Sequence, residues 1–215
     1  MMTKIIPTAI FIVIFYIIPL LPRVDLMLTF QIGFIILTCT TLLITQPPLS
    51  INESKANKTR DKSSIWVIMG TVGLIELLMV IEWAYIRNDF HEFTWDYLTI
   101  IGSVLIIAGS IFRILSILTL GKHFTATVRT QDKQEIVQHG AYKYIRHPSY
   151  LGAYLAVIGT TIFMHTYISI AFAIVAMFLA YWYRIKVEEV ALVEDFGNAY
   201  TEYQKKTKRM IPLIY

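Results

Sequence analysis

The sequence has few of the residues that build soluble enzymes and disulfide-bonded proteins. Only 16% of its 215 residues are charged, and Cys39 is its one cysteine. A lone cysteine excludes an intrachain disulfide and any metal site made of clustered cysteines, and we predict no metal site. The sequence also lacks a P-loop, a GxGxxG pattern, an internal repeat and a low-complexity tract. Nothing in it therefore indicates a soluble nucleotide-binding domain.

The apolar residues that dominate the chain lie in long runs. They make up 56% of the sequence, and six runs could enter a bilayer: roughly residues 5–21, 26–45, 65–86, 97–119, 149–164 and 167–183. The second, third and fourth reach the roughly 20 residues that a transmembrane helix needs. The last two are shorter and adjoin at residues 165–167, which predicts a helical hairpin. Since the alternation of barrel strands is absent, we predict an all-α fold, a polytopic membrane helix bundle of about six membrane segments.

The basic residues indicate how the bundle is oriented. With the N-terminus inside, sixteen lysines and arginines fall in cytosolic segments, whereas the outer loops hold Arg23 and Arg87. Both termini are therefore expected in the cytosol, and the net charge of +4 reflects topology, not a nucleic-acid partner. The first run contains Pro7 and Pro19 and is not followed by a signal-peptidase pattern, so we expect it to remain a membrane segment.

Three ionisable residues interrupt the apolar runs. They are Glu76 and Glu82 in the third run and Arg113 in the fourth. Such residues are costly in lipid and mark either a structural pairing or a polar cavity. We expect Glu76 to pair with Arg113, and Glu82, near the outer end, to reach water. Lining of a polar cavity is the alternative.

The remaining polar residues of interest lie in the final third of the chain. Gly140 permits a turn, and Pro148 suits the first position of the fifth helix, which places Arg146 and His147 beside a helix N-terminus at the cytosolic interface. Helix N-termini favour carboxylates and phosphates.

The end of the sixth run adds a cation and two carboxylates. Arg184 and Glu188 are four residues apart on one helix face, and Glu189 points about 100° away. By itself this pair is typical of a salt bridge on a solvated helix end. A hairpin, however, would bring the start of helix five against the end of helix six, so we expect His147 and Tyr150 near Arg184 and Glu188.

Two segments of this region resemble a known enzyme family. The sequence "GAYKYIRHPSYLG" (140–152) and, about 35 residues later, "VEEVALVEDFGNAYTEY" (187–203) are similar to the isoprenylcysteine carboxyl methyltransferases and their prokaryotic relatives, which use S-adenosylmethionine. The resemblance spans residues 121–215. It implies two parts, N-terminal transmembrane helices over 1–120 and a methyltransferase catalytic region over 121–215 with a cytosolic cofactor-binding region, the hairpin and a C-terminal helix.

The resemblance also implies a reaction and a set of site residues. The reaction is carboxyl O-methylation of a lipid-tailed acceptor, such as a prenylated cysteine, that enters from the membrane lipids. The implied location is the plasma membrane in a prokaryote or the endoplasmic reticulum in a eukaryote, with the protein integral to that membrane. Arg184 would bind the acceptor carboxylate and, with Glu188, form the catalytic pair. The implied cofactor-binding residues are Arg129, Gln134, Glu135, Ile136, Val137, Tyr142, His147, Pro148, Ser149, Tyr150 and Glu188. Glu189 has the more structural role.

Other interpretations stay open at this point. Phospholipid amines and lipophilic phenols are alternative acceptors; each must lose a proton, so His147 or Glu188 would serve as base. Sterol reductases that use NADPH share a similar Arg-His-Pro-Tyr element but lack the segment from Val187 to Tyr203. A non-enzymatic membrane scaffold is a further class.

Overall fold

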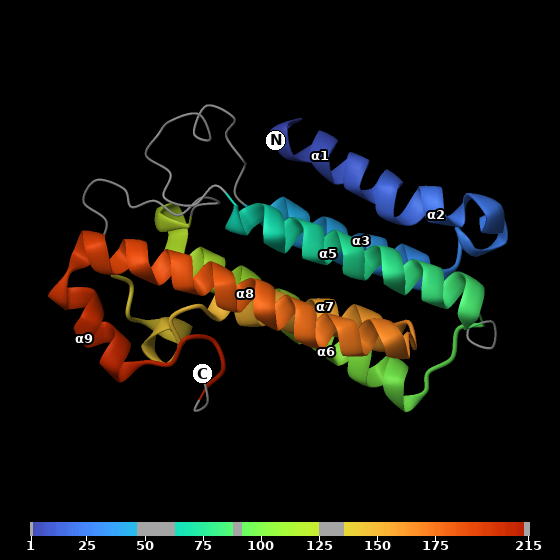
Figure 1. The fold of residues 1–215 in the computed structure, drawn as a ribbon. Helices are drawn as coiled ribbons and strands as arrows, with labels where there is room; N and C mark the ends of the chain where they lie inside the picture. The colour runs from blue at the N-terminus through green and yellow to red at the C-terminus, as the bar shows by residue number, and fades with distance from the viewer. Residues whose placement is uncertain (1, 47–62, 88–91, 125–135, 213–215) are drawn as a thin grey trace.

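The computed structural model describes residues 2–46, 63–87, 92–124 and 136–212, and these form a bundle of long helices (Figure 1). The all-α membrane bundle predicted from the sequence is confirmed. The described part holds one β-bridge, between Ile145 and Lys208. The helices, in chain order, are α1 (Met2–Ile12), η1 (Val13–Ile17), α2 (Ile18–Leu20), η2 (Leu21–Leu26), α3 (Phe30–Thr45), α5 (Ser64–Ile81), η3 (Glu82–Ile86), α6 (Tyr97–Leu120), η5 (Gly121–His123), η6 (Gly140–Lys143), α7 (Pro148–Phe163), α8 (Tyr167–Phe196) and α9 (Asn198–Lys206).

Within the described residues, four helical segments are long and apolar enough to cross a membrane. They are Lys4–Leu26, Ser64–Ile86, Tyr97–Leu120 and Tyr167–Phe196. The expectation that the second run has full spanning length was wrong, because the helix there, α3, begins only at Phe30 and has 16 residues. The first run reaches 23 residues because α1, η1, α2 and η2 continue one another. Six complete spans therefore remain a prediction.

The C-terminal hairpin forms as predicted, and its second helix is longer than expected. α7 and α8 are joined by Met164–Thr166, where His165 adopts a positive φ of 56°. The His165 ring lies 2.7 Å from Asp96, which also caps α6 by accepting a hydrogen bond from the Thr99 N–H. α8 runs on past residue 183 to Phe196, so Arg184 and Glu188 lie on regular helix.

α6 and α7 pack with their backbones in close approach. A Cβ added to Gly109 would lie 2.6 Å from the carbonyl oxygen of Gly152, and a Cβ on Gly152 would lie 2.6 Å from the backbone nitrogen of Arg113. Gly102 of α6 and Gly159 of α7 make the same kind of close backbone contact further along this interface. Small residues at such positions allow membrane helices to pack tightly, and here they fix the start of α7 against α6.

The ionisable residues inside the bundle have partners other than those expected. Glu76 accepts a hydrogen bond of 2.7 Å from the Tyr16 hydroxyl and does not pair with Arg113. Glu82 is only 4% exposed and does not reach water. It instead accepts hydrogen bonds from the backbone N–H groups of Ile168 and Ser169 and from the Ser169 hydroxyl, so it caps α8 from another helix.

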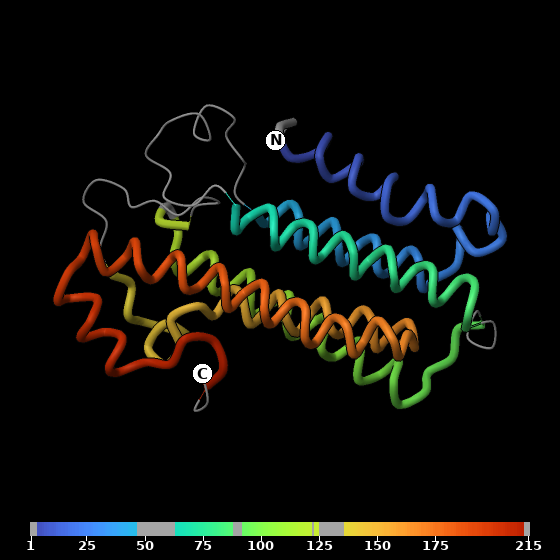
Figure 2. The backbone as a smooth tube through the Cα atoms, in the orientation of Figure 1, coloured from blue at the N-terminus to red at the C-terminus, as the bar shows by residue number. Residues whose placement is uncertain are grey.

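After α8 the chain doubles back. Gly197, at a φ of 56°, ends α8, and α9 then leads the chain back along the bundle (Figure 2). The segment after α9, residues 207–212, which we call the tail, returns to the residues just before α7: Lys208 N–H donates to Tyr144 O, and Arg146 N–H donates to Lys208 O. Sequence positions about 60 apart thus meet at one end of the bundle.

Candidate functional site

The tail fixes the backbone in front of α7. The Ile145–Lys208 bridge is extended by a hydrogen bond of 2.9 Å from the His147 N–H to the Arg209 carbonyl. Pro148 then begins α7 without needing an N–H partner. The backbone N–H groups of Tyr150 and Leu151 donate to the His147 carbonyl, so these donors are already used within the first turn.

Glu189 lies at the centre of a buried charge cluster. Its Oε1 accepts a hydrogen bond of 2.6 Å from Arg146 Nε and lies 3.4 Å from His147 Nε2, and its Oε2 accepts one of 2.9 Å from Arg209 Nε. The Arg146 and Glu189 side chains are 6% and 5% exposed. Arg146 also donates to the carbonyls of Gln204 and Thr207. The cluster therefore joins α8, the start of α7 and the tail.

Arg184, Glu188 and Tyr150 form a second polar group, the Tyr150 cluster. The Tyr150 hydroxyl donates to Glu188 Oε2 at 2.6 Å and accepts from Arg184 Nε at 3.2 Å, whereas Arg184 Nε and Glu188 Oε2 are 3.7 Å apart. Arg184 Nη1 also donates to the Ser64 hydroxyl of α5 at 2.9 Å. The phenol thus links a cation and a carboxylate that spacing alone would pair directly.

The two residues of this pair differ in their access to solvent. The Arg184 side chain is 4% exposed, whereas that of Glu188 is 27% exposed. Within the part of the chain that the structure describes, Glu188 Oε1 accepts no hydrogen bond. Glu188 can therefore meet a cationic group that arrives from outside, and Arg184 provides a cation in a water-poor position.

Two aromatic rings hold Tyr150 in place. The His147 and Tyr150 rings stack with centroids 5.6 Å apart and an interplanar angle of 6°, and Tyr150 stacks on Tyr181 of α8 at 5.0 Å and 16°. The imidazole of His147 is 5% exposed and faces Glu189. His147 thus connects the Glu189 charge cluster to the Tyr150 cluster.

Tyr142, in η6, is a buried donor. Burial, reinforced by the negative charge of Glu188, raises the pKa of the Tyr142 phenol well above its usual value, so the phenol stays protonated. Its hydroxyl donates to Ser116 O at 3.3 Å, and its carbonyl accepts from the Tyr203 hydroxyl of α9 at 2.6 Å. The residue ties α6, η6 and α9 together.

The residues predicted as a site from the sequence fall into three groups. His147, Tyr150, Arg184 and Glu188 meet as expected through the hairpin, and Tyr142, Pro148 and Ser149 lie buried on the same segment. Ile136 and Val137 lie half-buried ahead of η6. Arg129, Gln134 and Glu135 are outside the described residues.

Several residues that contribute to this region were not predicted. Tyr181 stacks on Tyr150, Arg209 binds Glu189 and Ser64 binds Arg184. Arg113, 1% exposed, donates through Nη1 to the Ser149 carbonyl at 3.1 Å, whereas its Nε and Nη2 have no hydrogen-bond partner among the described residues. The charge of Arg113 inside an apolar run was the one feature of the sequence that could have indicated a role here. Tyr181, Arg209 and Ser64 have no such feature, because their partners are remote in sequence.

Comparison with known proteins supports the resemblance seen in the sequence. Residues 100–194 match the sequence profile of the isoprenylcysteine carboxyl methyltransferase (ICMT) family. The chain is 32% identical over 131 residues to a protein-S-isoprenylcysteine O-methyltransferase of Xenopus laevis, covering 60% of this chain and 45% of that protein. It is 35% identical over 118 residues to the Saccharomyces cerevisiae protein of the same name, covering 54% of this chain and 49% of that protein.

The likeness extends to the fold. A solved structure of the eukaryotic intramembrane Ras methyltransferase ICMT superposes with a TM-score of 0.58 and 26% identity, covering 96% of this chain and 74% of that one. The matched segments span about half the length of the relatives found by sequence, 45% and 49% for the two above. The resemblance to this family that the sequence suggested is confirmed over the matched residues.

Proposed function

From the ICMT-family sequence of residues 100–194, we propose that this protein is a membrane methyltransferase that uses S-adenosylmethionine to methylate the carboxylate of a lipid-tailed acceptor such as a prenylated cysteine. The observation that carries the proposal is the Tyr150 cluster: an arginine, a carboxylate and a phenol are hydrogen-bonded together within the region that shares the family's sequence. The relatives are named for this reaction.

The carboxylate of Glu188 is suited to binding the methyl donor. S-adenosylmethionine carries an ammonium group and a sulfonium, and an ionised carboxylate is the side chain that pairs best with such cations. Glu188 has one carboxylate oxygen held by Tyr150, and its other oxygen accepts no hydrogen bond from the described residues. Glu188 would bind the ammonium group while Tyr150 keeps the carboxylate in one orientation.

Arg184 is suited to the acceptor. Its guanidinium is almost fully buried and is held by Tyr150 and Ser64. A guanidinium in such a position can grip a carboxylate with two parallel hydrogen bonds, and the low exposure strengthens the attraction. We propose that Arg184 holds the acceptor carboxylate in line with the methyl group, with Glu188 completing the catalytic pair.

The residues around the acceptor need not supply a base. When bound, S-adenosylmethionine supplies a methyl group that the acceptor's carboxylate oxygen takes while the C–S bonding pair stays on sulfur. A carboxylate is already ionised at pH 7, so no proton has to be removed. Arg184, Tyr150 and Glu188 would act by alignment and by excluding water from the reacting charges.

The other predicted positions complete the proposed site. Around the methyl donor we place Ile136 and Val137, Tyr142 of η6, and His147, Pro148 and Ser149 at the start of α7. To these we add Arg129, Gln134 and Glu135, which lie outside the described residues. In this arrangement residues 1–120 form the membrane scaffold and 121–215 the catalytic region. With both termini in the cytosol, the donor would arrive from water and the acceptor from the bilayer.

Two paired variants test the proposal. Calorimetry with S-adenosylhomocysteine should show binding to the purified protein, and radiolabelled S-adenosylmethionine should label a prenylcysteine in preference to a phospholipid or a phenolic lipid. Glu188→Gln should raise the cofactor Kd by about 10- to 100-fold. Arg184→Lys should keep that Kd and lower turnover at saturating cofactor, because the fork is lost.

The contrary outcomes are equally specific. Absence of S-adenosylhomocysteine binding in the wild type would remove the methyltransferase proposal. Equal small losses of cofactor affinity and of turnover in both variants would show that Arg184 and Glu188 only brace each other. They would remove Arg184 from the acceptor site.

A further inference from the structure

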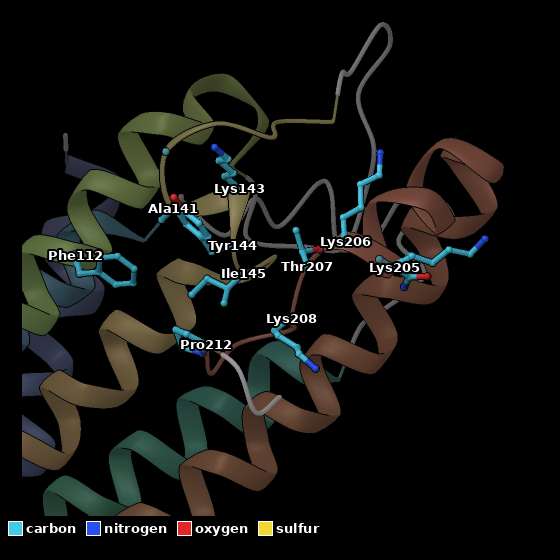
Figure 3. Close-up of a pocket in the computed structure, with 12 residues that line it drawn as sticks. Phe112, Ala141, Lys143, Tyr144, Ile145, Lys205, Lys206, Thr207, Lys208 and Pro212 are labelled. Atoms are coloured by element: carbon cyan, nitrogen blue, oxygen red, sulfur yellow. The ribbon is translucent and has the colours of Figure 1, made fainter.

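A cavity of about 800 Å³ opens at the end of the bundle that carries α9 (Figure 3). Its walls come from α6, from η6 and the two residues after it, and from the end of α9 and the tail up to Pro212. None of the residues proposed above to bind the methyl donor or the acceptor lines it. The cavity is therefore a feature separate from the proposed active site.

The floor of the cavity is apolar, and one of its residues belongs to a helix that is long enough to cross a membrane. Phe112 and Ile145 line it, together with Ala141 and Pro212 (Figure 3). Phe112 lies eight residues before Leu120, the last residue of α6, which places it about 12 Å inside that end of the helix. Since α6 is long and apolar enough to cross a membrane, the lipid chains of a bilayer around α6 would lie beside Phe112.

The rim of the cavity is basic. Lys143, Lys205, Lys206 and Lys208 line it and are exposed, and in Figure 3 their side chains extend outward from the floor. Lys205 pairs with Glu202 at 2.7 Å. Among the residues that the structure describes, no carboxylate lies within ion-pair distance of the other three lysines. Three lysines without an ion-pair partner among the described residues thus surround an apolar floor.

From this arrangement we infer that the cavity binds an anionic phospholipid of the bilayer. One acyl chain would lie against Phe112 and Ile145, and the headgroup phosphate would meet Lys206 and Lys208, with Lys143 on the opposite wall. A basic rim above an apolar floor at membrane depth complements both parts of such a lipid. Phosphatidylcholine would place its own cationic group among the lysines. The inference does not depend on the methyltransferase proposal, because binding requires neither methyl donor nor acceptor.

Lipid retention by the whole protein tests the inference. The protein in neutral detergent is mixed with phosphatidylglycerol or phosphatidylcholine, and bound lipid is counted by native mass spectrometry. We expect one phosphatidylglycerol to bind in preference. Lys206→Gln with Lys208→Gln should weaken that binding about 25-fold, at about fivefold for each lysine near an anionic headgroup. The control, Lys4→Gln with Lys186→Gln, removes the same net charge away from the cavity and should bind like the wild type.

A cavity-filling variant separates the pocket from general surface charge. Ala141→Phe keeps every lysine and occupies the space above the floor, so it should also lose phosphatidylglycerol. The apparent Tm without added lipid shows whether each variant is folded. Equal retention of phosphatidylcholine, equal loss in the control pair, or full binding by Ala141→Phe would each overturn the inference.

Discussion

Replacing Glu189 with glutamine should release the tail from the bundle. The carboxylate of Glu189 accepts hydrogen bonds from Arg146 Nε at 2.6 Å and Arg209 Nε at 2.9 Å, with His147 Nε2 at 3.4 Å. In Glu189→Gln, the buried Arg146 cation keeps its contacts to the carbonyls of Gln204 and Thr207 but loses its counterion.

The size of the effect follows from burial. Removing one partner of a buried ion pair costs about 3 to 5 kcal/mol, because the other charge stays buried without compensation. Arg146 retains its carbonyl partners, so we expect a cost at the lower end of this range. About 3 kcal/mol corresponds to a roughly 100-fold rise in the population of tail-undocked protein, at tenfold for each 1.4 kcal/mol.

Limited proteolysis with trypsin measures this population directly. Lys208 and Arg209 are held by backbone hydrogen bonds to Tyr144, Arg146 and His147, so cleavage after them requires the tail to undock. When undocking and docking are fast, the cleavage rate follows the undocked population. Intact-mass measurement separates these products from cleavage at the exposed Lys205 and Lys206.

The neighbouring residue supplies the control. Glu188→Gln makes the same chemical change one position earlier, on a side chain that is 27% exposed and contacts Tyr150 and Arg184 rather than the tail. It should leave tail cleavage at the wild-type rate. If Glu189→Gln and Glu188→Gln were cleaved after Arg209 equally fast, the reasoning that Glu189 holds the tail would be refuted.

Three further predictions concern the membrane bundle, each measured as an apparent Tm at a fixed scan rate in detergent. Gly109→Ala should lose about 1 to 3 kcal/mol, since its Cβ would lie 2.6 Å from the Gly152 carbonyl oxygen, while Gly70→Ala, with nothing within 4 Å, should not lose stability. Glu82→Gln should lose about 1 to 3 kcal/mol as the charge that caps α8 disappears, and an unchanged Tm would contradict that capping role. Arg113→Met should stabilise the ligand-free protein by about 1 to 4 kcal/mol, because two donors of this buried cation lack partners in the described part of the chain; a lower Tm would show that the cation is compensated.

Composition and the order of motifs were enough to determine the class of the protein. Only helices and closed barrels satisfy their backbone groups in lipid, and the sequence lacks the alternation of barrel strands. The all-α bundle therefore followed from the sequence without knowledge of packing. The three-residue connection after α7 likewise required an antiparallel hairpin, which brought His147 and Tyr150 to Arg184 and Glu188. Local chain geometry left few alternatives at these points.

Where each intramembrane charge finds its partner was decided by tertiary structure. Glu76 pairs with Tyr16 instead of Arg113, and Glu82 caps α8 across the bundle, because helix rotation and order set these contacts and neither is encoded in hydropathy. The same holds for α3, whose length depends on where the preceding helix ends.

The difference between Glu188 and Glu189 shows both contributions. Helical periodicity indicated that these two neighbours point in different directions, and the resemblance assigned them different roles. Only the return of the tail, from about 20 residues later, places Arg209 on Glu189 and leaves Glu188 with Tyr150 and Arg184. The sequence determined that two adjacent carboxylates diverge, and the fold decided which one is buried among cations, because burial depends on segments that approach from elsewhere in the chain.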